Sequence, residues 1–191
     1  MNFNHPAFFN GYRELFSATL TQSQIEGFET LLCFIEQDAG LTDVRHIAYL
    51  LATVKHECAD RWQPIAEFAS GQQYEGRRDL GNIRSGDGPR YKGRGYVQIT
   101  GRVNYRKFGE RLRVDLEGDP ALALEPALSY RIASLGMRQG LFTGRSLSSF
   151  IHEDHCDYRQ ARRIINGLDR ADRIRMYAEK LEQVLRACQL A

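Results

Sequence analysis

The stretch Tyr91-Lys92-Gly93-Arg94-Gly95-Tyr96-Val97-Gln98-Ile99-Thr100-Gly101 differs most from the otherwise helical pattern of the chain. Its first glycines imitate a dinucleotide-binding fingerprint, but the third glycine position is occupied by Gln98, so we reject that interpretation. The β-branched and aromatic residues from Tyr96 to Thr100 are typical of a short strand. We therefore predict loops with one or two short strands here.

Glycine and positive charge extend well beyond this stretch. Eight of the seventeen glycines lie between residues 69 and 101, which predicts a loop-rich insert. From Arg77 to Arg113, eleven basic residues accompany three acidic ones, so this segment carries +8 in a chain of net charge +2. With the nearby tyrosines, such a segment could bind nucleic acid or a carboxylate-bearing sugar polymer, or form a solvated loop face.

Helical patterns flank the insert on both sides. Apolar residues recur at three- and four-residue steps from Thr21 to Gly40, from Asp43 to Glu57, and in several segments after Pro126. The chain has 191 residues, of which 42% are hydrophobic and 26% charged, as in ordinary globular proteins. We therefore predict a predominantly α-helical α+β fold that forms a single domain over residues 1–191, with the basic insert at about residues 69–101.

The cellular compartment is predicted from the cysteines and from the first residues. Four widely spaced cysteines in a chain of this length predict buried free thiols rather than a disulfide framework. The start Met1-Asn2-Phe3-Asn4-His5-Pro6 has neither the basic nor the apolar region of a signal peptide, and no run of 18 apolar residues follows. We expect a cytoplasmic protein without stable membrane insertion.

Two glutamates are candidates for acid–base chemistry. Glu57 ends the second predicted helix at the margin of its apolar stripe, where partial burial suits a carboxyl group to general-acid chemistry. Glu67 follows ten residues later, after Pro64 has ended any helix. Hydrolysis of a glycosidic bond uses two carboxyl groups that flank the bond. With 24 acidic residues in the chain, however, such a pair also arises by chance.

Several motifs together carry a family resemblance. They are the glycine-rich stretch quoted above, Lys55-His56-Glu57, Glu67-Phe68-Ala69-Ser70-Gly71, Tyr74-Glu75-Gly76-Arg77, Asn104-Tyr105, Ile165-Asn166-Gly167 and Ala171-Asp172-Arg173-Ile174. They resemble glycoside hydrolase family 19, the chitinase-like family, and more closely its compact branch of phage and prophage endolysins. The resemblance spans about residues 20 to 180. It implies a lysozyme-like two-lobed fold, with a loop-rich small lobe, and an inverting mechanism.

The resemblance also implies roles for individual residues. It makes Glu57 the general acid, Glu67 the base that activates water, and Thr100 the hydroxyl group that helps to hold this water. Glu75 is a less favoured rival for the base. The residues that it implies for sugar binding, or in the last case for support of the acidic pair, are Tyr96, Gln98, Asn104, Asn166 and Arg173.

We expect no metal and no cofactor. The run His152-Glu153-Asp154-His155-Cys156 contains metal-ligating residue types, but its histidines are three residues apart, and no second cluster completes a tetrahedral site.

The function implied by the resemblance is that of an endolysin, which hydrolyses β-1,4 glycosidic bonds in the glycan strands of bacterial peptidoglycan. We expect a monomer that needs a holin-type pore for release to the cell wall at lysis, and no nucleic-acid partner. A chitinase that acts on N-acetylglucosamine polymers is the alternative within the same class. A non-catalytic polyanion-binding protein is the alternative outside it.

Overall fold

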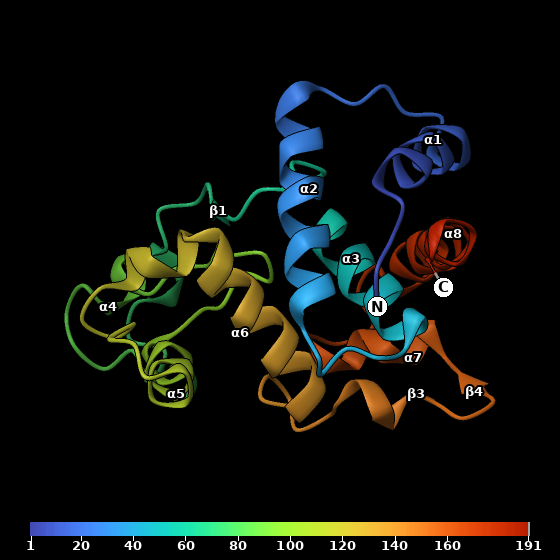
Figure 1. Cartoon of the computed structure of the whole chain (residues 1–191). Helices are drawn as coiled ribbons and strands as arrows, with labels where there is room; N and C mark the ends of the chain where they lie inside the picture. Colours follow the sequence, from blue (N-terminus) through green and yellow to red (C-terminus); the bar gives the residue numbers. More distant parts are fainter. Residues whose placement is uncertain (191) are drawn as a thin grey trace. The chain divides into compact units, whose positions relative to one another are not determined.

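The computed structural model describes residues 1–190 of the chain, which form two compact units. Unit 1 comprises Met1–Trp62 and Ser134–Ala191, and unit 2 comprises Gln63–Ala133. Helices dominate the described residues, and the strands form two short two-stranded sheets (Figure 1). The predicted α+β, predominantly helical class is confirmed. The single catalytic domain stays a prediction.

Helix α3 (Val44–Glu57) forms the centre of unit 1. The side chain of Asp43 caps it by accepting a hydrogen bond from the Arg45 N–H. Every residue from Ile47 to Lys55 is buried, and a helix buried on all sides lies inside a core. Helix α8 (Ala171–Cys188) packs against α3, and α1 (His5–Phe16) packs against α8 (Figure 1).

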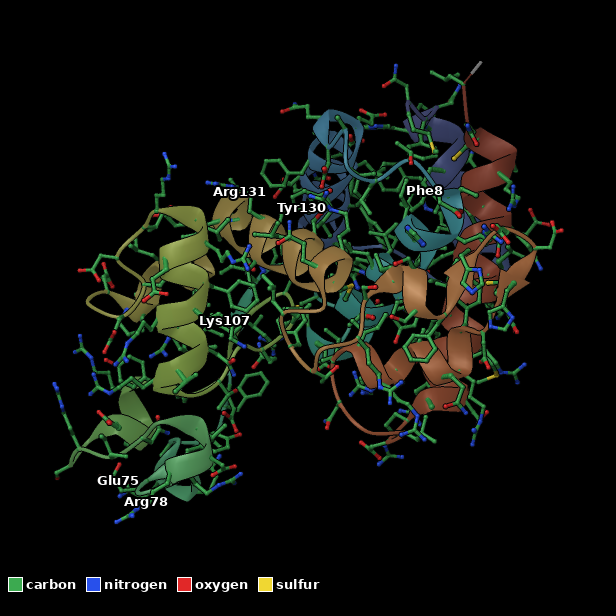
Figure 2. All side chains as sticks on the ribbon, turned by 90° about the horizontal axis from the view of Figure 1, so that it is seen from below. Phe8, Glu75, Arg78, Lys107, Tyr130 and Arg131 are labelled. Atoms are coloured by element: carbon green, nitrogen blue, oxygen red, sulfur yellow. The ribbon has the colours of Figure 1, made fainter. Side chains whose placement is uncertain are left out.

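Aromatic residues fill the rest of this core. Helix α2 (Gln22–Gln37) begins with a capping box between Thr21 and Gln24. Its Phe28 stacks on Trp62, with ring centroids 3.7 Å apart, and Trp62 is fully buried. Phe8 lies among the side chains of unit 1 (Figure 2). The remaining elements of unit 1 are η4 (Leu147–Ser149), β3 (Ile151–His152), β4 (His155–Cys156), α7 (Tyr158–Ala161) and η5 (Arg162–Ile164).

Unit 2 contains the basic segment and a minimal sheet. Strand β1 (Ile65–Ala66) pairs antiparallel with β2 (Arg94–Gly95), with Ile65 opposite Gly95. Buried tyrosine and phenylalanine rings form its core, among them Tyr91, Tyr105 and Phe108. The other elements are η1 (Gln72–Tyr74), η2 (Arg78–Leu80), α4 (Asp87–Arg90), α5 (Arg102–Leu112), η3 (Pro120–Leu124) and the first part of α6 (Pro126–Gln139).

The predicted strand from Tyr96 to Thr100 is wrong. The strand ends at Gly95, and the next three residues form a turn that returns Ile99 to an isolated bridge with Arg94. Gly95 has a φ of 87°, and a Cβ atom there would lie 2.9 Å from the carbonyl oxygen of Ala123. Glycine at this position therefore lets the chain turn where an extended strand would continue.

The cysteines differ partly from expectation. All four are free; Cys58 and Cys188 are buried, as predicted, whereas Cys33 and Cys156 are exposed. The prediction of buried thiols is therefore wrong for the exposed pair, because Cys33 lies on the outer face of α2 and Cys156 lies in the short β3–β4 hairpin. Within residues 1–190, no helix combines the length and the apolar character that crossing a membrane requires.

Candidate active site

The predicted site residues divide between the two units. Glu57, Asn166 and Arg173 belong to unit 1. Glu67, Tyr96, Gln98, Thr100 and Asn104 belong to unit 2.

Glu57 is the last residue of α3, at the point where the buried helix ends. Its side chain is 17% exposed, and its Oε1 accepts a hydrogen bond of 2.7 Å from Nη1 of Arg162. The Arg162 side chain is only 3% exposed, and its Nε donates to the carbonyl oxygen of Asp169. Oε2 of Glu57 has no hydrogen-bond partner within the described chain. The carboxylate is therefore held through Oε1, and Oε2 remains available to contact a ligand.

The sequence predicted a different arginine beside the acid. Arg173 is exposed and forms no ion pair with Glu57 in the described structure, whereas Arg162 does. Arg162 lies on η5, where the hydroxyl group of Thr143 donates to the carbonyl oxygens of Arg163 and Ile164. The available signal was an arginine inside an apolar helical pattern, because such a residue is buried only when it is paired.

His56 precedes the candidate acid and is half-buried. Burial lowers the pKa of His56; Glu57 raises it, and the positive charges of Arg162 and Arg173 lower it again. The net lowering keeps the imidazole neutral at neutral pH. Arg162 is then the positive charge in direct contact with Glu57.

Glu67 directly follows β1 and continues its pairing, since its N–H donates to the carbonyl oxygen of Gly93 at 2.8 Å. Its Oε1 accepts hydrogen bonds from Gln73 Nε2 at 2.9 Å and from the Tyr74 hydroxyl at 3.0 Å. Its Oε2 accepts one from the N–H of Gly93 at 3.1 Å. Burial, together with the contact with Glu67, raises the pKa of Tyr74, so the phenol remains a donor. Three donors therefore fix the orientation of this carboxylate.

Gln98 and Glu67 converge on Gly93. Gln98 Nε2 donates to the carbonyl oxygens of Ile65 and Gly95, at 2.8 and 2.9 Å, so its amide joins the two strands. A Cβ atom on Gly93 would lie 2.8 Å from Gln98 Oε1 and 3.3 Å from Glu67 Oε2. Gln98 also has a φ of 53°, a left-handed conformation that is costly for a residue other than glycine and concentrates at functional sites.

Thr100 and Asn104 continue this polar arrangement. Thr100 Oγ1 donates to the carbonyl oxygen of Gln98 at 3.0 Å, and Asn104 Nδ2 donates to that of Thr100 at 2.8 Å. Both side chains are half-buried. Hydrogen bonds to the backbone therefore fix both side chains: the Thr100 hydroxyl group on the carbonyl oxygen of Gln98, and the Asn104 amide on the carbonyl oxygen of Thr100.

The remaining predicted sugar-binding residues lie apart from these. Tyr96 is only 1% exposed, so its ring belongs to the core of unit 2, and its N–H donates to the hydroxyl group of Ser129. Asn166 is exposed, and its Oδ1 accepts a hydrogen bond from the N–H of Gly167. Of these two residues, only Asn166 presents its side chain to solvent.

Glu75, the rival for the base, has a different environment. Its Oε1 accepts a hydrogen bond from the N–H of Gly86 at 2.7 Å, and its Oε2 accepts one from the N–H of Gly88 at 2.8 Å. These two bonds fix the turn that begins α4. The contacts of Glu75 therefore describe a carboxylate that supports a loop.

The histidine-rich hairpin shows no metal-binding geometry. The rings of His152 and His155 lie 5.2 Å apart, and within residues 1–190 no group of three or more His, Cys, Asp or Glu residues could hold a metal ion. The candidate site consists of carboxylates, amides, a hydroxyl group and an arginine, and this set suits acid–base chemistry.

Comparison with known proteins gives partial sequence matches. A Haemophilus influenzae protein described as containing a glycosyl hydrolase family 19 domain is 35% identical over 77 residues, which are 38% of each chain. An endochitinase from Carica papaya is 34% identical over 107 residues, which are 49% of this chain and 44% of that protein. A scan of family models found no match. The matches span less than half the length of these relatives.

Solved structures support the fold over nearly the whole chain. Chitinase C from Streptomyces griseus HUT6037 matches with a TM-score of 0.63 and 19% identity, over 93% of this chain and 74% of that one. A mutant of chitinase C matches with a TM-score of 0.54 and 18% identity, over 97% and 91%. The chain is thus similar, in local sequence and in fold, to the chitinase-like proteins of glycoside hydrolase family 19, which confirms the predicted resemblance to this family. Its closer resemblance to the endolysin branch stays a prediction.

Proposed function

We propose that this protein is a glycoside hydrolase that cuts the β-1,4 bonds of peptidoglycan glycan strands with inversion at the anomeric carbon. The observation that carries the proposal is the convergence of the Glu67 and Gln98 side chains on Gly93, where a Cβ atom would lie 2.8 Å from Gln98 Oε1 and 3.3 Å from Glu67 Oε2. Such close placement of a carboxylate and an amide is expected where a sugar and an attacking water molecule must be held in a defined relative position and orientation.

In this proposal Glu57 is the general acid. Arg162 holds Oε1, so Oε2 delivers the proton to the oxygen of the departing sugar. Inverting enzymes place the second carboxyl group about 6.5–9.5 Å from the acid, so that water fits between the second group and the sugar. The acid must regain its proton from solvent before the next cycle.

Glu67 is the base in this proposal. Among the described residues, its Oε2 accepts one hydrogen bond, from the N–H of Gly93, and a carboxylate oxygen has two acceptor positions. The free position can take the proton of the attacking water. The Thr100 hydroxyl group, which donates its own proton to the carbonyl oxygen of Gln98, accepts a hydrogen bond from the same water. Gln98, Asn104 and Asn166 remain candidates for binding the sugar, and Tyr96 supports the turn from the core.

Substitution of the carboxyl groups tests this assignment. We expect Glu57→Gln and Glu67→Gln to reduce the hydrolysis of purified sacculi by about 10²- to 10⁴-fold, the usual contribution of a general acid or base. Glu75→Gln is the matched control; it should retain activity, because its contacts support a loop. Thermal unfolding of each variant separates lost chemistry from lost folding. Equal rates for wild type and Glu57→Gln would contradict the proposal.

The similarity to a papaya endochitinase favours chitin as the second candidate substrate. Release of soluble oligomers from chitin, with no loss of turbidity of sacculi, would select this alternative. If sacculi are digested, mass spectrometry of the new reducing ends identifies whether the cut follows muramic acid or glucosamine.

The cellular role that we propose follows from the endolysin resemblance. The protein acts as a monomer, stays in the cytoplasm until lysis, and reaches the wall through a holin-type pore made by another protein. Sedimentation of the purified protein and lysis assays with and without such a pore test these two points.

A further inference from the structure

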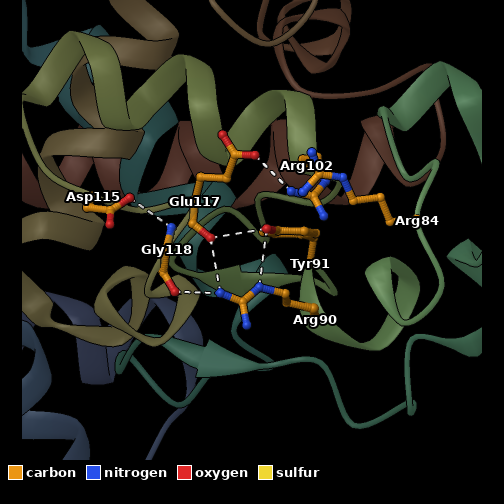
Figure 3. Close-up of a pocket in the computed structure, with 7 residues that line it drawn as sticks. All are labelled: Arg84, Arg90, Tyr91, Arg102, Asp115, Glu117 and Gly118. Atoms are coloured by element: carbon orange, nitrogen blue, oxygen red, sulfur yellow. Dashed lines mark hydrogen bonds and ion pairs between the residues drawn. The ribbon is translucent and has the colours of Figure 1, made fainter.

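A shallow pocket in unit 2 lies outside the site described so far. Its volume is about 390 Å³, and its lining includes three arginines, one tyrosine and two carboxylates: Arg84, Arg90, Arg102, Tyr91, Asp115 and Glu117 (Figure 3). None of these residues is among the individual catalytic or sugar-binding residues that the resemblance implies. The lining is mostly charged, so it suits a small polar ligand.

Much of this charge is already paired and forms a fixed frame. Arg102 is bonded to the buried Asp87 and donates to Glu117 Oε1 at 2.8 Å. Its guanidinium group lies over the ring of Tyr91, 4.6 Å from the centroid. Arg106 donates to the second oxygen of Glu117. These contacts occupy Arg102 and Glu117, so neither is available as the main partner of a ligand.

Arg90 completes the frame through the backbone. Its Nη2 donates to the carbonyl oxygen of Gly118 at 2.5 Å, and its Nε donates to the Tyr91 hydroxyl group at 3.2 Å. That hydroxyl group donates in turn to the carbonyl oxygen of Glu117 at 3.1 Å. The closed set of bonds is drawn in Figure 3. The floor of the pocket is therefore rigid before any ligand arrives.

Two charged groups of the lining remain available. The guanidinium group of Arg84 makes no hydrogen bond or ion pair with any residue from 1 to 190, although its backbone N–H is fixed by Asp87 Oδ2 at 3.0 Å. Asp115 is exposed; its Oδ1 accepts from the N–H of Gly118, and its Oδ2 is unpartnered among the described residues. Figure 3 shows Arg84 and Asp115 on opposite sides of the pocket.

We propose that this pocket binds the zwitterionic end of a short peptide, with a carboxylate at Arg84 and a protonated amine at Asp115. The planar guanidinium fork matches a carboxylate in two hydrogen bonds, and the free Asp115 oxygen accepts from an ammonium group. A neutral N-acetylated glycan offers neither charge. The peptides attached to peptidoglycan offer both, so this inference rests on the proposed function and specifies its substrate as a glycan that carries peptides.

The pocket is connected to the proposed base through a short backbone segment. Arg90 and Tyr91 line the pocket, and two residues further on the N–H of Gly93 holds Glu67 Oε2. Between them, Lys92 Nζ donates to the carbonyl oxygen of Glu67 at 3.0 Å. A peptide bound in the pocket therefore contacts the same segment that orients the carboxylate.

A binding titration tests the pocket without any catalysis. The probes are alanylalanine, N-acetylalanine, which has only the carboxylate, and alaninamide, which has only the amine. We expect alanylalanine to shift the backbone amide resonances of Arg84 and Gly118, and each singly charged probe to bind about tenfold more weakly, as the loss of one charged hydrogen bond predicts.

Variants assign the two charges. Arg84→Gln and Asp115→Asn should each weaken alanylalanine about tenfold, while the exposed control changes Arg131→Gln and Glu110→Gln leave its affinity unchanged. Equal affinity of all three probes, unchanged affinity in both pocket variants, or no shift at all would overturn the proposal.

An activity assay then tests whether the pocket makes the protein prefer glycan strands that carry peptides. We expect Arg84→Gln to raise KM about tenfold on peptide-bearing sacculi, with no change on glycan strands stripped of peptide by an amidase. An equal effect on both substrates would contradict the assignment. The titration measures peptide binding even if the wild-type protein cuts neither substrate. A failure of the proposed hydrolase function can therefore be distinguished from a failure of the pocket to bind the peptide.

Discussion

Gly93 is the single residue on which the geometry of the candidate base depends. Because its φ lies outside the left-handed region, its importance is steric rather than conformational. We expect Gly93→Ala to displace the Gln98 amide and the Glu67 carboxylate, since the new Cβ would lie 2.8 Å from Gln98 Oε1. A displacement of about 1 Å can lower a rate about 100-fold, so kcat/KM on sacculi should fall to about that extent.

The matched control for this prediction is Gly11→Ala in α1. A Cβ atom there meets Val184 at 3.4 Å, an ordinary contact, and alanine favours the helix over glycine. Gly11→Ala should retain full activity and stability. If Gly93→Ala is as active as the wild type, the convergence on Gly93 has no part in catalysis, and the observation that carries the proposed function is lost.

Sequence could predict the residues of the site better than their partners. Glu57 was placed correctly at a helix end because the apolar repeat that precedes it is local. Its contact with Arg162 joins residues 105 positions apart, and no local pattern encodes such a pair. The resemblance implied that Tyr96 binds sugar, but the turn that Gly95 permits directs its ring into the core.

At the scale of elements, α5 shows how charge can conceal a helix. The segment from Arg102 to Leu112 contains four basic residues, and its charge made it part of the predicted basic segment rather than a predicted helix. Yet Tyr105, Phe108 and Leu112 recur at helical spacing and are buried. Helices α2, α3 and α8 were predicted because their apolar stripes are longer and their other faces carry less charge.

The ion pairs that attach α5 to the following loop should give unit 2 a defined acid sensitivity. Hydrogen bonds from Arg106 and Arg102 lower the pKa of Glu117 to about 2, from an ordinary value of 4.5. A carboxyl group with a lowered pKa stabilises the folded state above its unfolded pKa, and this stabilisation is lost as pH falls through the folded pKa. The loss from Glu117 therefore lies between about pH 4.5 and pH 2.

Denaturant unfolding at a series of pH values measures this effect. We expect the midpoint of wild type to fall more steeply between pH 4.5 and pH 2 than that of Glu117→Gln, which has no carboxyl group to titrate there. Glu110→Gln, an exposed change on the same helix, should follow the wild-type curve. Parallel curves for wild type and Glu117→Gln would show that these ion pairs contribute nothing in this range.

At the scale of the whole molecule, folding removes most of the charge asymmetry seen in the sequence. Unit 2 has twelve basic and nine acidic residues, a net charge of +3, and unit 1 carries −1. Acidic residues after position 113, among them Asp115 and Glu117, join the basic segment in unit 2. Several of its cations are also internal donors: Lys92 and Arg94, for example, donate to backbone carbonyl oxygens.

This balance argues against a protein that functions by binding polyanions. A protein that makes six to ten contacts with phosphates loses about 10³- to 10⁵-fold in affinity between about 50 and 200 mM salt. Here some basic side chains of the segment form ion pairs, some donate hydrogen bonds to the backbone, and the others lie at the surface. The positive electrostatic potential outside unit 2 should therefore be weak. We therefore expect salt to change the rate of wall lysis by only a few-fold over the same range.

A double variant measures the part that surface charge does play. Arg78 and Arg131 are exposed residues of unit 2 (Figure 2). Neither side chain has a hydrogen-bond or ion-pair partner among residues 1–190. We expect Arg78→Gln combined with Arg131→Gln to slow turbidity loss of permeabilised cells a few-fold at about 20 mM salt and to have no effect at about 200 mM, where the Debye length is below 10 Å. A loss that persists at high salt would mean that these arginines contact the wall directly, because screening removes long-range attraction but not a short-range contact.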